Sequence, residues 1–408
     1  MTGGRRARVA AVLMAAMAVA ALGTRGTGDR TAGAGWPGPS FAPPTTVATL
    51  VAAGRGERMS APVEVVICTP ASLAERAART LVVGLPETTG PDDPLVAEVT
   101  DVGVGGVLLT HANVESTDQV RSLVSALRER SRRPLVVSAD EEPGRVKTFG
   151  AITGPEPSAR RMAAEGTPDD VRDAARASAQ LLDDLGVDVN LAPVADLDAG
   201  PWDGVIGDRS YSDDPETAAT YALAYARGMV DGGVVPVVKH FPGHGRTDED
   251  DHFTAPTVDT PLEDLVGTDL RPFSRLVGAG APVVMMGHVA FDAIEPGVPA
   301  SLSQPAYRLL RDLGFAGVAI TDSIGMGAVN LRWDYGRATV KAIAAGADGV
   351  LGTDGWSARW MRDALVEAVE TGELPEARLD EAAARMAALA GDDPRSLTCA
   401  PAALPALE

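Results

Sequence analysis

The 408-residue sequence is poor in basic, aromatic and histidine residues. Its 36 Lys and Arg residues stand against 56 Asp and Glu residues, so the formal net charge is -20 at pH 7. Nucleic acids and anionic membrane surfaces bind basic patches, and the sequence contains none, so neither is expected as a partner. Aromatic residues make up 4% of the chain and histidine occurs five times, which makes any cluster of these residues informative.

Motifs for nucleotide binding and for serine hydrolases are also missing. No Gly-Lys-Ser/Thr phosphate loop and no Gly-x-Gly-x-x-Gly fingerprint follows an apolar run, and there is no Gly-x-Ser-x-Gly nucleophile elbow. His240 and His244 have the spacing of zinc ligands on a helix, but Pro242 and Gly243 between them break a helix. We therefore expect no metal site and no organic cofactor.

The first 60 residues do not have the pattern of a folded domain. Three arginines precede the apolar run Val9–Leu22, which small residues follow, so we expect residues 1–23 to be a signal peptide and the protein to be exported, secreted or associated with the cell wall. The run is short for a bilayer, so no integral membrane span is expected in the mature protein, and an uncleaved anchor is the alternative. Residues 24–60, rich in Gly, Ala, Thr and Pro, are predicted to be a disordered linker.

The chain has only two cysteines, Cys68 and Cys399, near the two ends of the predicted catalytic domain, residues 61–400. Outside the cytoplasm an even number of cysteines usually forms disulfides. We expect these two to be bonded, which in the chain-entropy model stabilises the fold by about 4 kcal/mol. Two unpaired structural cysteines are the alternative.

Short apolar runs alternate with amphipathic segments throughout this domain. Eight runs are predicted as buried strands: 81–85, 106–110, 134–138, 187–191, 234–238, 282–286, 317–321 and 349–351. Seven segments are predicted as helices: 116–130, 169–185, 215–231, 262–276, 304–313, 337–345 and 356–370. This alternation is typical of a single-domain α/β fold, the (β/α)8 TIM-like barrel. A doubly wound open sheet is the alternative, because periodicity does not show whether the sheet closes.

In such a barrel, the residues just beyond the carboxyl ends of the strands face one pocket. These residues are His111, Asp140, Asp196, Lys239, His240, His288, Asp322 and Asp354. The segment 239–252 is the richest in titratable groups, with three of the five histidines among carboxylates. Carboxylates combined with histidine are the groups used for glycosyl transfer to water.

Asp322 among the strand-end residues, and Asp250 with His252 in the segment 239–252, suggest the chemistry. Asp322 follows a strand and could attack an anomeric carbon. Asp250 and His252 are two residues apart, so in a turn the carboxylate can contact the imidazole, raise its pKa and fix its tautomer, which would provide an acid. A solvated acidic loop is the alternative for this segment.

Several motifs resemble those of a known family. Lys239-His240-Phe241-Pro242-Gly243-His244-Gly245, followed by Asp250-x-His252, is similar to the signature of glycoside hydrolase family 3 enzymes of the β-N-acetylglucosaminidase type. The segments 140–146, 186–196, 206–211 and 320–326 also resemble family segments in the same order. The Asp-x-His pair is what separates this branch from the β-glucosidase branch.

The resemblance implies a retaining exo-β-N-acetylglucosaminidase that acts on cell-wall (peptidoglycan) fragments. Asp322 would form the covalent intermediate, and His252, supported by Asp250, would be the acid/base. The residues implied to bind the sugar are Asp140, Arg145, Arg209, Lys239 and His240. N-acetylglucosamine-containing saccharides are the expected partners, and a monomer is expected.

Alternatives remain at this point. They are a β-glucosidase, a phosphorylase in which phosphate replaces water, and a catalytically weak sugar-binding protein, suggested by Pro143 where the family commonly has glycine. Instead of binding sugar, Lys239 and His240 could each be held in a structural ion pair with a carboxylate under the pocket. His244 is expected to brace the loop, and His111 and His288 to be pocket wall or satisfied core histidines.

Overall fold

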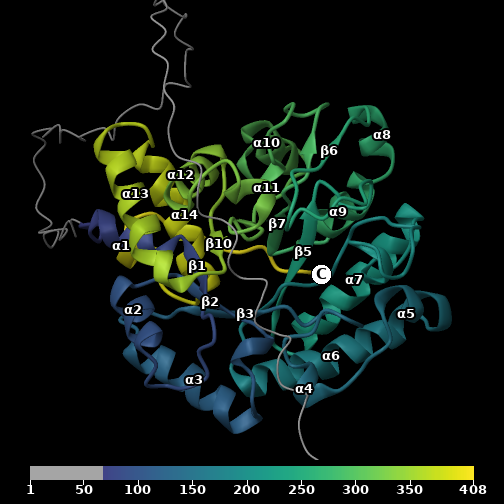
Figure 1. Cartoon of the computed structure of the whole chain (residues 1–408), viewed down its shortest axis with the longest axis horizontal. Helices are drawn as coiled ribbons and strands as arrows, with labels where there is room; N and C mark the ends of the chain where they lie inside the picture. The colour runs from purple at the N-terminus through teal and green to yellow at the C-terminus, as the bar shows by residue number, and fades with distance from the viewer. Residues whose placement is uncertain (1–67) are drawn as a thin grey trace, which may run out of the picture. The chain divides into compact units, whose positions relative to one another are not determined.

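The computed structural model describes residues 68–408. The predicted signal peptide (1–23) and linker (24–60) lie outside the described residues. Eight strands form one sheet in the order β10-β1-β2-β3-β4-β5-β7-β9, and all their pairings are parallel (Figure 1). Their bounds are β1 (Leu81–Gly84), β2 (Gly106–Leu109), β3 (Val136–Ala139), β4 (Val189–Asn190), β5 (Val235–Phe241), β7 (Val283–Met286), β9 (Val318–Thr321) and β10 (Val350–Gly352).

The two edges of this sheet meet at β10. On one side β10 pairs with β1 through Val350 and Leu81. On the other side an isolated parallel bridge joins Ile320 of β9 to Gly349, and the Thr321 amide donates to the Gly349 carbonyl oxygen at 3.0 Å. The strands therefore form a nearly closed barrel, which confirms the predicted (β/α)8 fold and excludes the open sheet.

The barrel interior is filled by apolar side chains from every strand. On β7, Val283 and Met285 belong to this interior cluster, whereas Val284 and Met286 belong to the cluster between strands and helices, as the period-two alternation of a strand requires. Both faces of the sheet are thus buried. This explains why the strands occur in the sequence as continuous apolar runs.

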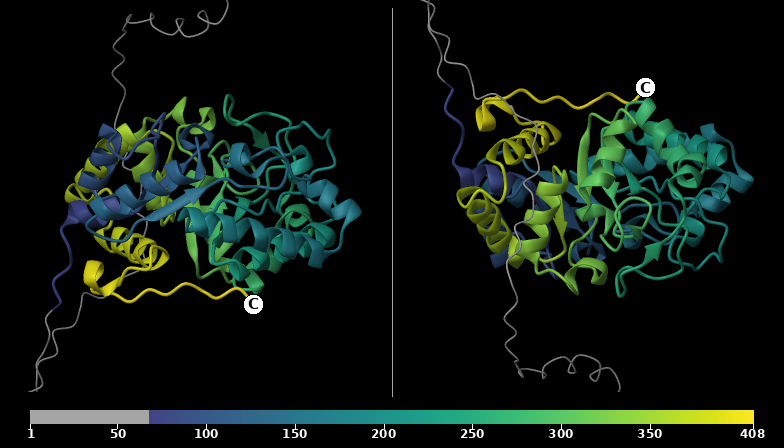
Figure 2. Two further views of the ribbon diagram at one scale, coloured as in Figure 1. Left: turned by 90° about the horizontal axis from the view of Figure 1, so that it is seen from below. Right: turned by 90° about the horizontal axis from the view of Figure 1, so that it is seen from above.

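Helices cover the outside of the barrel (Figure 1, Figure 2). The predicted segments that form single helices are α3 (Thr117–Arg130), α6 (Pro168–Leu185), α7 (Pro215–Asp231), α10 (Gln304–Asp312), α12 (Tyr335–Ala345) and α13 (Ala358–Glu370). The ends of α6 follow from its sequence: the Thr167 side chain accepts a hydrogen bond from the Asp170 amide, and Gly186 ends the helix with a φ of +82°. No helix within residues 68–408 is long and apolar enough to cross a membrane.

The predicted helix 262–276 is wrong. The structure contains two helices there, α8 (Leu262–Gly267) and α9 (Leu270–Gly278). The break lies at Thr268 and Asp269, whose side chains accept hydrogen bonds from Arg246 at 2.7 Å each. Because Arg246 belongs to the loop after β5, the break provides contacts that hold that loop.

Several elements are absent from the sequence-based prediction. They are helices α1 (Leu73–Arg79), α2 (Pro94–Val102), α4 (Gly150–Thr153), α5 (Ala159–Glu165), α11 (Gly327–Asn330), α14 (Glu376–Leu389) and α15 (Arg395–Thr398), and the strand pair β6 (Thr257–Val258) and β8 (Ala290–Phe291). Helix α14 is rich in alanine and has few large apolar side chains, so its apolar periodicity is weak. The others are short.

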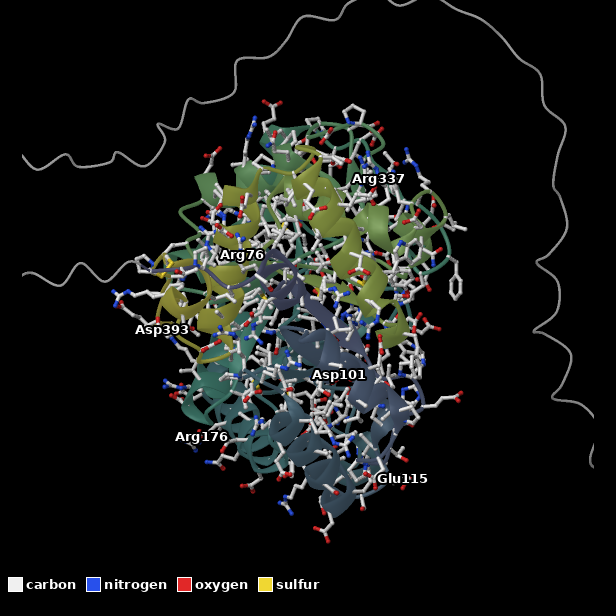
Figure 3. The ribbon with its side chains drawn as sticks, turned by 90° about the vertical axis from the view of Figure 1, so that its left-hand side faces the viewer. Arg76, Asp101, Glu115, Arg176, Arg337 and Asp393 are labelled. Carbon is white, nitrogen blue, oxygen red and sulfur yellow. A yellow bond between two sulfur atoms is a disulfide. The ribbon has the colours of Figure 1, made fainter. Side chains whose placement is uncertain are left out.

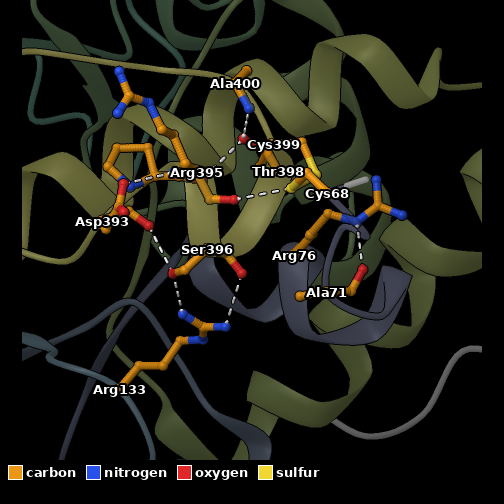
Figure 4. Close-up of a disulfide and its surroundings, with 11 residues drawn as sticks. Cys68, Ala71, Arg76, Arg133, Asp393, Arg395, Ser396, Thr398, Cys399 and Ala400 are labelled. Carbon is orange, nitrogen blue, oxygen red and sulfur yellow. Dashed lines mark hydrogen bonds between the residues drawn. A yellow bond between two sulfur atoms is a disulfide. The ribbon is translucent and has the colours of Figure 1, made fainter. Parts of the chain in front are cut away.

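Cys68 and Cys399 form a disulfide bond, as predicted (Figure 4). Cys68 precedes α1 and Cys399 directly follows α15. Arg76 of α1, which is labelled in Figure 3, pairs with Glu376 of α14 at 2.7 Å. The disulfide and the ion pair thus connect the start of the described chain to its last helices.

After Cys399 the chain continues as an extended segment along the domain (Figure 2). Leu404 packs against the interior cluster of the barrel, and the Glu408 amide donates to the Ala279 carbonyl oxygen at 2.8 Å. Ala279 precedes β7, so this segment covers the amino-terminal ends of the strands. The carboxyl ends, where barrel enzymes have their active sites, lie on the opposite side.

Removal of the disulfide should destabilise the domain. The double substitution Cys68→Ser and Cys399→Ser removes a cross-link between residues 331 positions apart, and a loss of about 2–4 kcal/mol in the free energy of unfolding is expected. Chemical denaturation of the wild type and the double variant measures this difference. The reduced wild type should match the variant, and equal stability of the variant and the oxidised wild type would contradict the prediction.

Candidate active site

A cavity of about 660 Å³ opens at the carboxyl ends of the barrel strands. This volume lies in the usual range for small-ligand sites, roughly 300–1,000 Å³. The eight residues predicted for catalysis or sugar binding all line this cavity: Asp140, Arg145, Arg209, Lys239, His240, Asp250, His252 and Asp322. The barrel therefore brings together residues from four loops that are far apart in the sequence.

Of the eight residues predicted at strand ends, four do not line the cavity, namely His111, Asp196, His288 and Asp354, so the prediction that they face it is wrong. His111 begins a 3-10 turn after β2 and is exposed. Asp354 accepts hydrogen bonds within the turn after β10 and caps that turn. In both loops the turn directs the predicted residue away, and a neighbouring threonine, Thr110 or Thr353, lines the cavity instead.

His288 is buried and is a satisfied core histidine. Its Nδ1 atom lies 2.7 Å from Ser301 Oγ, and its Nε2 atom lies 2.8 Å from the Ser323 carbonyl oxygen. Since Ser323 follows Asp322, His288 supports the loop that carries the predicted nucleophile. Of the two roles expected for this residue, the core role is the observed one.

Four charged residues, from two loops and strand β5, form a network on one wall of the cavity. Lys239 Nζ lies 2.5 Å from Asp140 Oδ1 and 2.7 Å from Glu142 Oε1. The Arg209 guanidinium donates Nε and Nη2 to the two Glu142 oxygens, each at 2.8 Å. Glu142 is only 2% exposed, so it is the buried carboxylate that joins the two cations.

The network keeps its members ionised. Burial alone would raise the pKa of the Glu142 carboxyl, but Arg209 and Lys239 outweigh burial and hold that pKa well below its ordinary value. Burial would lower the pKa of the Lys239 amine, and Asp140 and Glu142 reverse this effect and raise it. The alternative of a structural ion pair for Lys239 is therefore observed, although Lys239 also lines the cavity. Glu142, two residues after Asp140 in the same motif, was not predicted from the sequence.

Lys239 and His240 are consecutive, yet both line the cavity. In a regular strand two consecutive side chains point to opposite faces. Strand β5 pairs with β7 at Val238 and again at Phe241, and the register shifts between these residues. This irregularity allows both side chains to reach the same cavity.

Asp196 is buried next to His240 and does not line the cavity. Its carboxylate lies 2.7 Å from His240 Nδ1 and accepts a hydrogen bond from the His244 amide at 2.8 Å. Burial would raise the pKa of Asp196, but His240 and the other donors outweigh burial and lower it. Nδ1 is therefore the protonated nitrogen of His240, and its Nε2 atom lies 4.0 Å from Asp322 Oδ2.

Asp322 follows β9, and its side chain is partly exposed to the cavity. The Ser323 amide donates to Asp322 Oδ1 at 2.7 Å, and the Asp322 amide donates to the Met286 carbonyl oxygen at 2.9 Å. These bonds fix both the backbone and the carboxylate. Such a carboxylate, with Oδ2 toward His240, can act as a nucleophile.

Asp250 and His252 are in contact, as their spacing predicts. Asp250 Oδ1 lies 2.8 Å from His252 Nδ1 and also accepts the His252 amide at 3.0 Å. The imidazole is 62% exposed. Because Nδ1 is occupied by Asp250, Nε2 is the ring nitrogen available for proton transfer.

The loop that carries His252 is docked onto α11, the short helix after Asp322. The Gly327 amide donates to the His252 carbonyl oxygen at 2.9 Å, and the Ala328 amide donates to the Asp251 carbonyl oxygen at 3.0 Å. A Cβ atom at Gly327 would lie 2.8 Å from the His252 oxygen, so the contact requires glycine. The loops after β5 and β9 are therefore joined, with His252 and Asp322 lining one cavity.

A second histidine–aspartate pair lies within the same loop and is buried. His244 Nε2 lies 3.2 Å from Asp251 Oδ2, and both side chains are buried. Burial would lower the pKa of His244, but Asp251 outweighs burial and raises it. Burial would raise the pKa of Asp251, and His244 lowers it to about 2. The ionised pair is thus favoured, and His244 braces the loop, as expected.

Asp250, Asp251 and His252 form a group of potential metal ligands within residues 68–408. One atom of each lies within 4.8 Å of the others. However, Asp250 is paired with His252 and Asp251 with His244. All three side chains that could bind a metal are therefore already paired.

Pro143 is compatible with the turn in which it lies. The next residue, Gly144, has a φ of +91°, and proline followed by a residue with positive φ is the pattern of a type II turn. The Glu142 amide donates to the Val146 carbonyl oxygen at 2.9 Å across the turn. The turn that positions Arg145 is therefore formed with proline in place.

Comparisons with known proteins identify the family. The family model described as "Glycosyl hydrolase family 3 N terminal domain" matches residues 76–389. Beta-hexosaminidase LpqI of Mycobacterium tuberculosis is 38% identical over 335 residues, which cover 80% of this chain and 85% of that protein. A crystal structure of a family 3 glycosyl hydrolase from Mycobacterium smegmatis has a TM-score of 0.73 at 38% identity and covers 78% of this chain and 97% of that one. A family 3 β-N-acetylglucosaminidase from Paenibacillus sp. FPU-7 has a TM-score of 0.74 at 34% identity and covers 82% of this chain and 64% of that one. The chain therefore belongs to glycosyl hydrolase family 3 and is a β-hexosaminidase of that family.

Proposed function

We propose that the protein is a retaining exo-β-N-acetylglucosaminidase that releases terminal β-linked N-acetylglucosamine from cell-wall (peptidoglycan) fragments. The observation that supports this most is that Asp322 and the Asp250–His252 pair line one cavity beside a buried charged network. A nucleophilic carboxylate and a separate proton donor are the two groups that a retaining glycosidase needs.

In the first step, Asp322 attacks the anomeric carbon while His252 Nε2–H protonates the glycosidic oxygen. The bond between the anomeric carbon and that oxygen breaks, the alcohol leaves, and a glycosyl-aspartate remains. Asp250 holds the Nδ1–H of His252, which stabilises the imidazolium before the proton is given away. In the second step, His252 accepts a proton from water, whose oxygen attacks the anomeric carbon and releases Asp322.

The sugar is held by Asp140, Arg145, Arg209, Lys239 and His240. Of the charged members, Asp140 and Arg145 have the most exposed side chains, at 34% and 37%, whereas that of Lys239 is 3% exposed. We therefore expect Asp140 and Arg145 to make the direct contacts with sugar hydroxyl and acetamido groups. Lys239 acts mainly by holding Asp140 in place.

Water is the acceptor that the cavity favours over phosphate. Five carboxylates line it, namely Asp140, Asp203, Asp250, Asp251 and Asp322, against three Lys and Arg residues. All three cations are already paired with carboxylates. When the acceptor enters, Asp322 is a neutral ester, and the other four carboxylates are balanced by these three cations and the ionised His244. An incoming phosphate dianion would find no unpaired cation among the described residues that line the cavity, whereas water needs none.

Loss of the nucleophile and loss of the acid should affect different substrates. Asp322→Ala should lower kcat at least about 10³-fold on every substrate, because no covalent intermediate can form. His252→Ala should lower hydrolysis of an N-acetylglucosamine disaccharide by about 10²–10⁴-fold and that of the nitrophenyl glycoside much less, because nitrophenolate leaves without protonation. Steady-state kinetics on both substrates measures these effects.

Asp203→Asn is the matched control, since Asp203 is another carboxylate that lines the cavity. It should change kcat far less than Asp322→Ala. Mass spectrometry of the wild type treated with a slow 2-fluoro sugar should detect an adduct on Asp322. Equal and mild losses from Asp322→Ala and His252→Ala would contradict the assigned roles.

Substrate and acceptor choice can be tested together. Nitrophenol release from the β-N-acetylglucosaminide should be much faster than from the β-glucoside, and added phosphate should leave the rate and the product unchanged. Chromatography of the product distinguishes N-acetylglucosamine from its 1-phosphate. Formation of the sugar phosphate would overturn the hydrolytic assignment, and no cleavage of either glycoside would favour a sugar-binding protein.

The His244–Asp251 pair should stabilise the enzyme within a limited pH window. The pKa of Asp251 falls from 3.8 to about 2 on folding, so its contribution is present above pH 4 and is lost as the pH falls toward 2. The pKa of His244 rises above 6.5, so its contribution is present below pH 6.5 and is lost as the pH rises through the raised value. Asp251→Asn should therefore cost on the order of 2 kcal/mol near pH 5.5, and less near pH 3 and pH 9.

Urea denaturation at these three pH values measures the effect. Asp250→Asn is the control, because Asp250 pairs with an exposed histidine and its loss should cost less stability. An identical loss for Asp251→Asn at all three pH values would show that the pair does not stabilise through its charges.

A further inference from the structure

Eight large hydrophobic side chains are exposed within residues 68–408, and four of them lie on loops at the carboxyl end of the barrel. These four are Trp202 after β4, Phe253 after β5, Leu331 after β9 and Trp356 after β10. Loops that follow parallel barrel strands meet at the same end, so the four side chains lie at the end of the barrel where the cavity opens, and Phe253 lines that cavity. In a chain with 4% aromatic residues, this is a notable concentration.

Phe253 is the member closest to the chemistry. It follows His252 directly, it lines the cavity, and its side chain is nevertheless 76% exposed. Its backbone lies against α11, where a Cβ atom at Gly327 would be 3.0 Å from Phe253 Cα. The ring therefore belongs to the same docked loop as the proposed acid, on the side from which the leaving group must receive its proton.

Trp202 lies on the loop after β4, the strand next to β5, and it directly precedes Asp203, which lines the cavity. This loop is held firmly although the indole is 66% exposed. The Asp208 amide donates to the Trp202 carbonyl oxygen at 3.0 Å. Gly207 has a φ of +54°, and a Cβ atom there would lie 2.5 Å from the same oxygen, so glycine is required.

Two charged side chains hold the same loop from inside. Arg160 donates to the carbonyl oxygens of Asp198, Gly200 and Gly207 at 2.9, 2.7 and 2.6 Å. The Asp198 carboxylate accepts the Gly207 amide at 2.6 Å. An exposed aromatic ring on a fixed backbone loses little conformational freedom when it binds a partner.

We infer that Phe253 and Trp202 form a binding surface for the saccharide on the leaving-group side of the cleaved bond. This inference rests on the proposed function and extends it to the substrate's second and following sugars. A β-linked N-acetylglucosamine ring has equatorial substituents and two faces of C–H groups, and such faces pack on aromatic rings.

The surroundings favour a saccharide as the occupant. Phe253 lines the sugar cavity, and so does Asp203, the residue that follows Trp202. The acidic surroundings disfavour an anionic lipid surface. Binding of a second sugar by Phe253 would also favour the docked position of the loop that carries His252, so leaving-group recognition and proton donation are coupled.

The test compares two substrates that need the same chemistry and differ in the second sugar. These are the methyl β-N-acetylglucosaminide and the β-1,4-linked N-acetylglucosamine disaccharide. In the double variant Phe253→Ala and Trp202→Ala, the ratio of kcat/KM for the disaccharide to that for the methyl glycoside should fall about tenfold. The conservative pair Phe253→Tyr and Trp202→Phe should retain most of the ratio.

Trp360→Ala is the matched control, because Trp360 is a 50% exposed tryptophan on α13 that contacts α12 rather than the cavity. It should leave the ratio unchanged, and thermal unfolding should confirm that all variants are folded. A ratio that does not fall in the double variant would overturn the inference while the proposed function stands. Equal losses on both substrates would also overturn it, since that result indicates only a displaced His252 loop.

A binding experiment separates this inference from failure of the proposed function. Calorimetric titration of the Asp322→Ala protein with the β-1,4-linked trisaccharide should give an affinity that the Phe253→Ala and Trp202→Ala substitutions weaken about tenfold. If the substitutions weaken binding and the protein with Asp322 intact hydrolyses neither substrate, the binding surface is supported and the hydrolase is rejected. Unchanged binding would reject the surface whatever the activity.

Discussion

The active site depends on one buried carboxylate, Glu142. It accepts hydrogen bonds from Arg209 and lies 2.7 Å from Lys239. Glu142 and Arg209 belong to the loops after β3 and β4, and Lys239 belongs to strand β5. A buried charge is costly unless it is paired, so each member holds the other two in position. Removal of Glu142 would leave two buried cations side by side. The proposed sugar-binding wall therefore forms as a unit, in which Asp140 pairs with Lys239.

A second set of contacts connects this wall to the catalytic groups. The Asp196 carboxylate contacts His240 Nδ1 and accepts a hydrogen bond from the His244 amide. The Nε2 atom of His240 in turn lies 4.0 Å from Asp322 Oδ2. His244 then pairs with Asp251, which lies between the proposed acid and its supporting carboxylate. Because Asp251 is also hydrogen-bonded to α11, the loops after β4, β5 and β9 share one continuous set of polar contacts. The position of the acid is therefore linked to the position of the nucleophile by the protein itself.

The sequence predicts the barrel well and the site only in part, for a physical reason. The strands are buried on both faces, so their apolar runs are visible in the sequence, whereas α14 is rich in alanine and shows little periodicity. The eight predicted site residues line one cavity because the ends of parallel strands must converge. His111 and Asp354 do not, because local turns direct them elsewhere. Glu142 was missed because neither burial nor ion pairing from distant loops can be seen in a linear sequence.

The two halves of the site differ in how firmly they are held. The side chains of Glu142 and Lys239 are 2% and 3% exposed, whereas those of Asp250 and His252 are 43% and 62% exposed. The proposed sugar-binding wall is thus part of the protein core. The proposed acid lies on an exposed part of its loop, which is attached by two backbone hydrogen bonds to α11, the His244–Asp251 pair, the His244 amide on Asp196 and the contacts of Arg246. This exposed part is held less firmly than the buried wall, so it is the part of the site that opens most easily. The proposed retaining mechanism requires a leaving sugar to be exchanged for water between its two steps, and a rigid wall with the proposed acid on a less firmly held loop would permit this exchange without disturbing the bound glycosyl group.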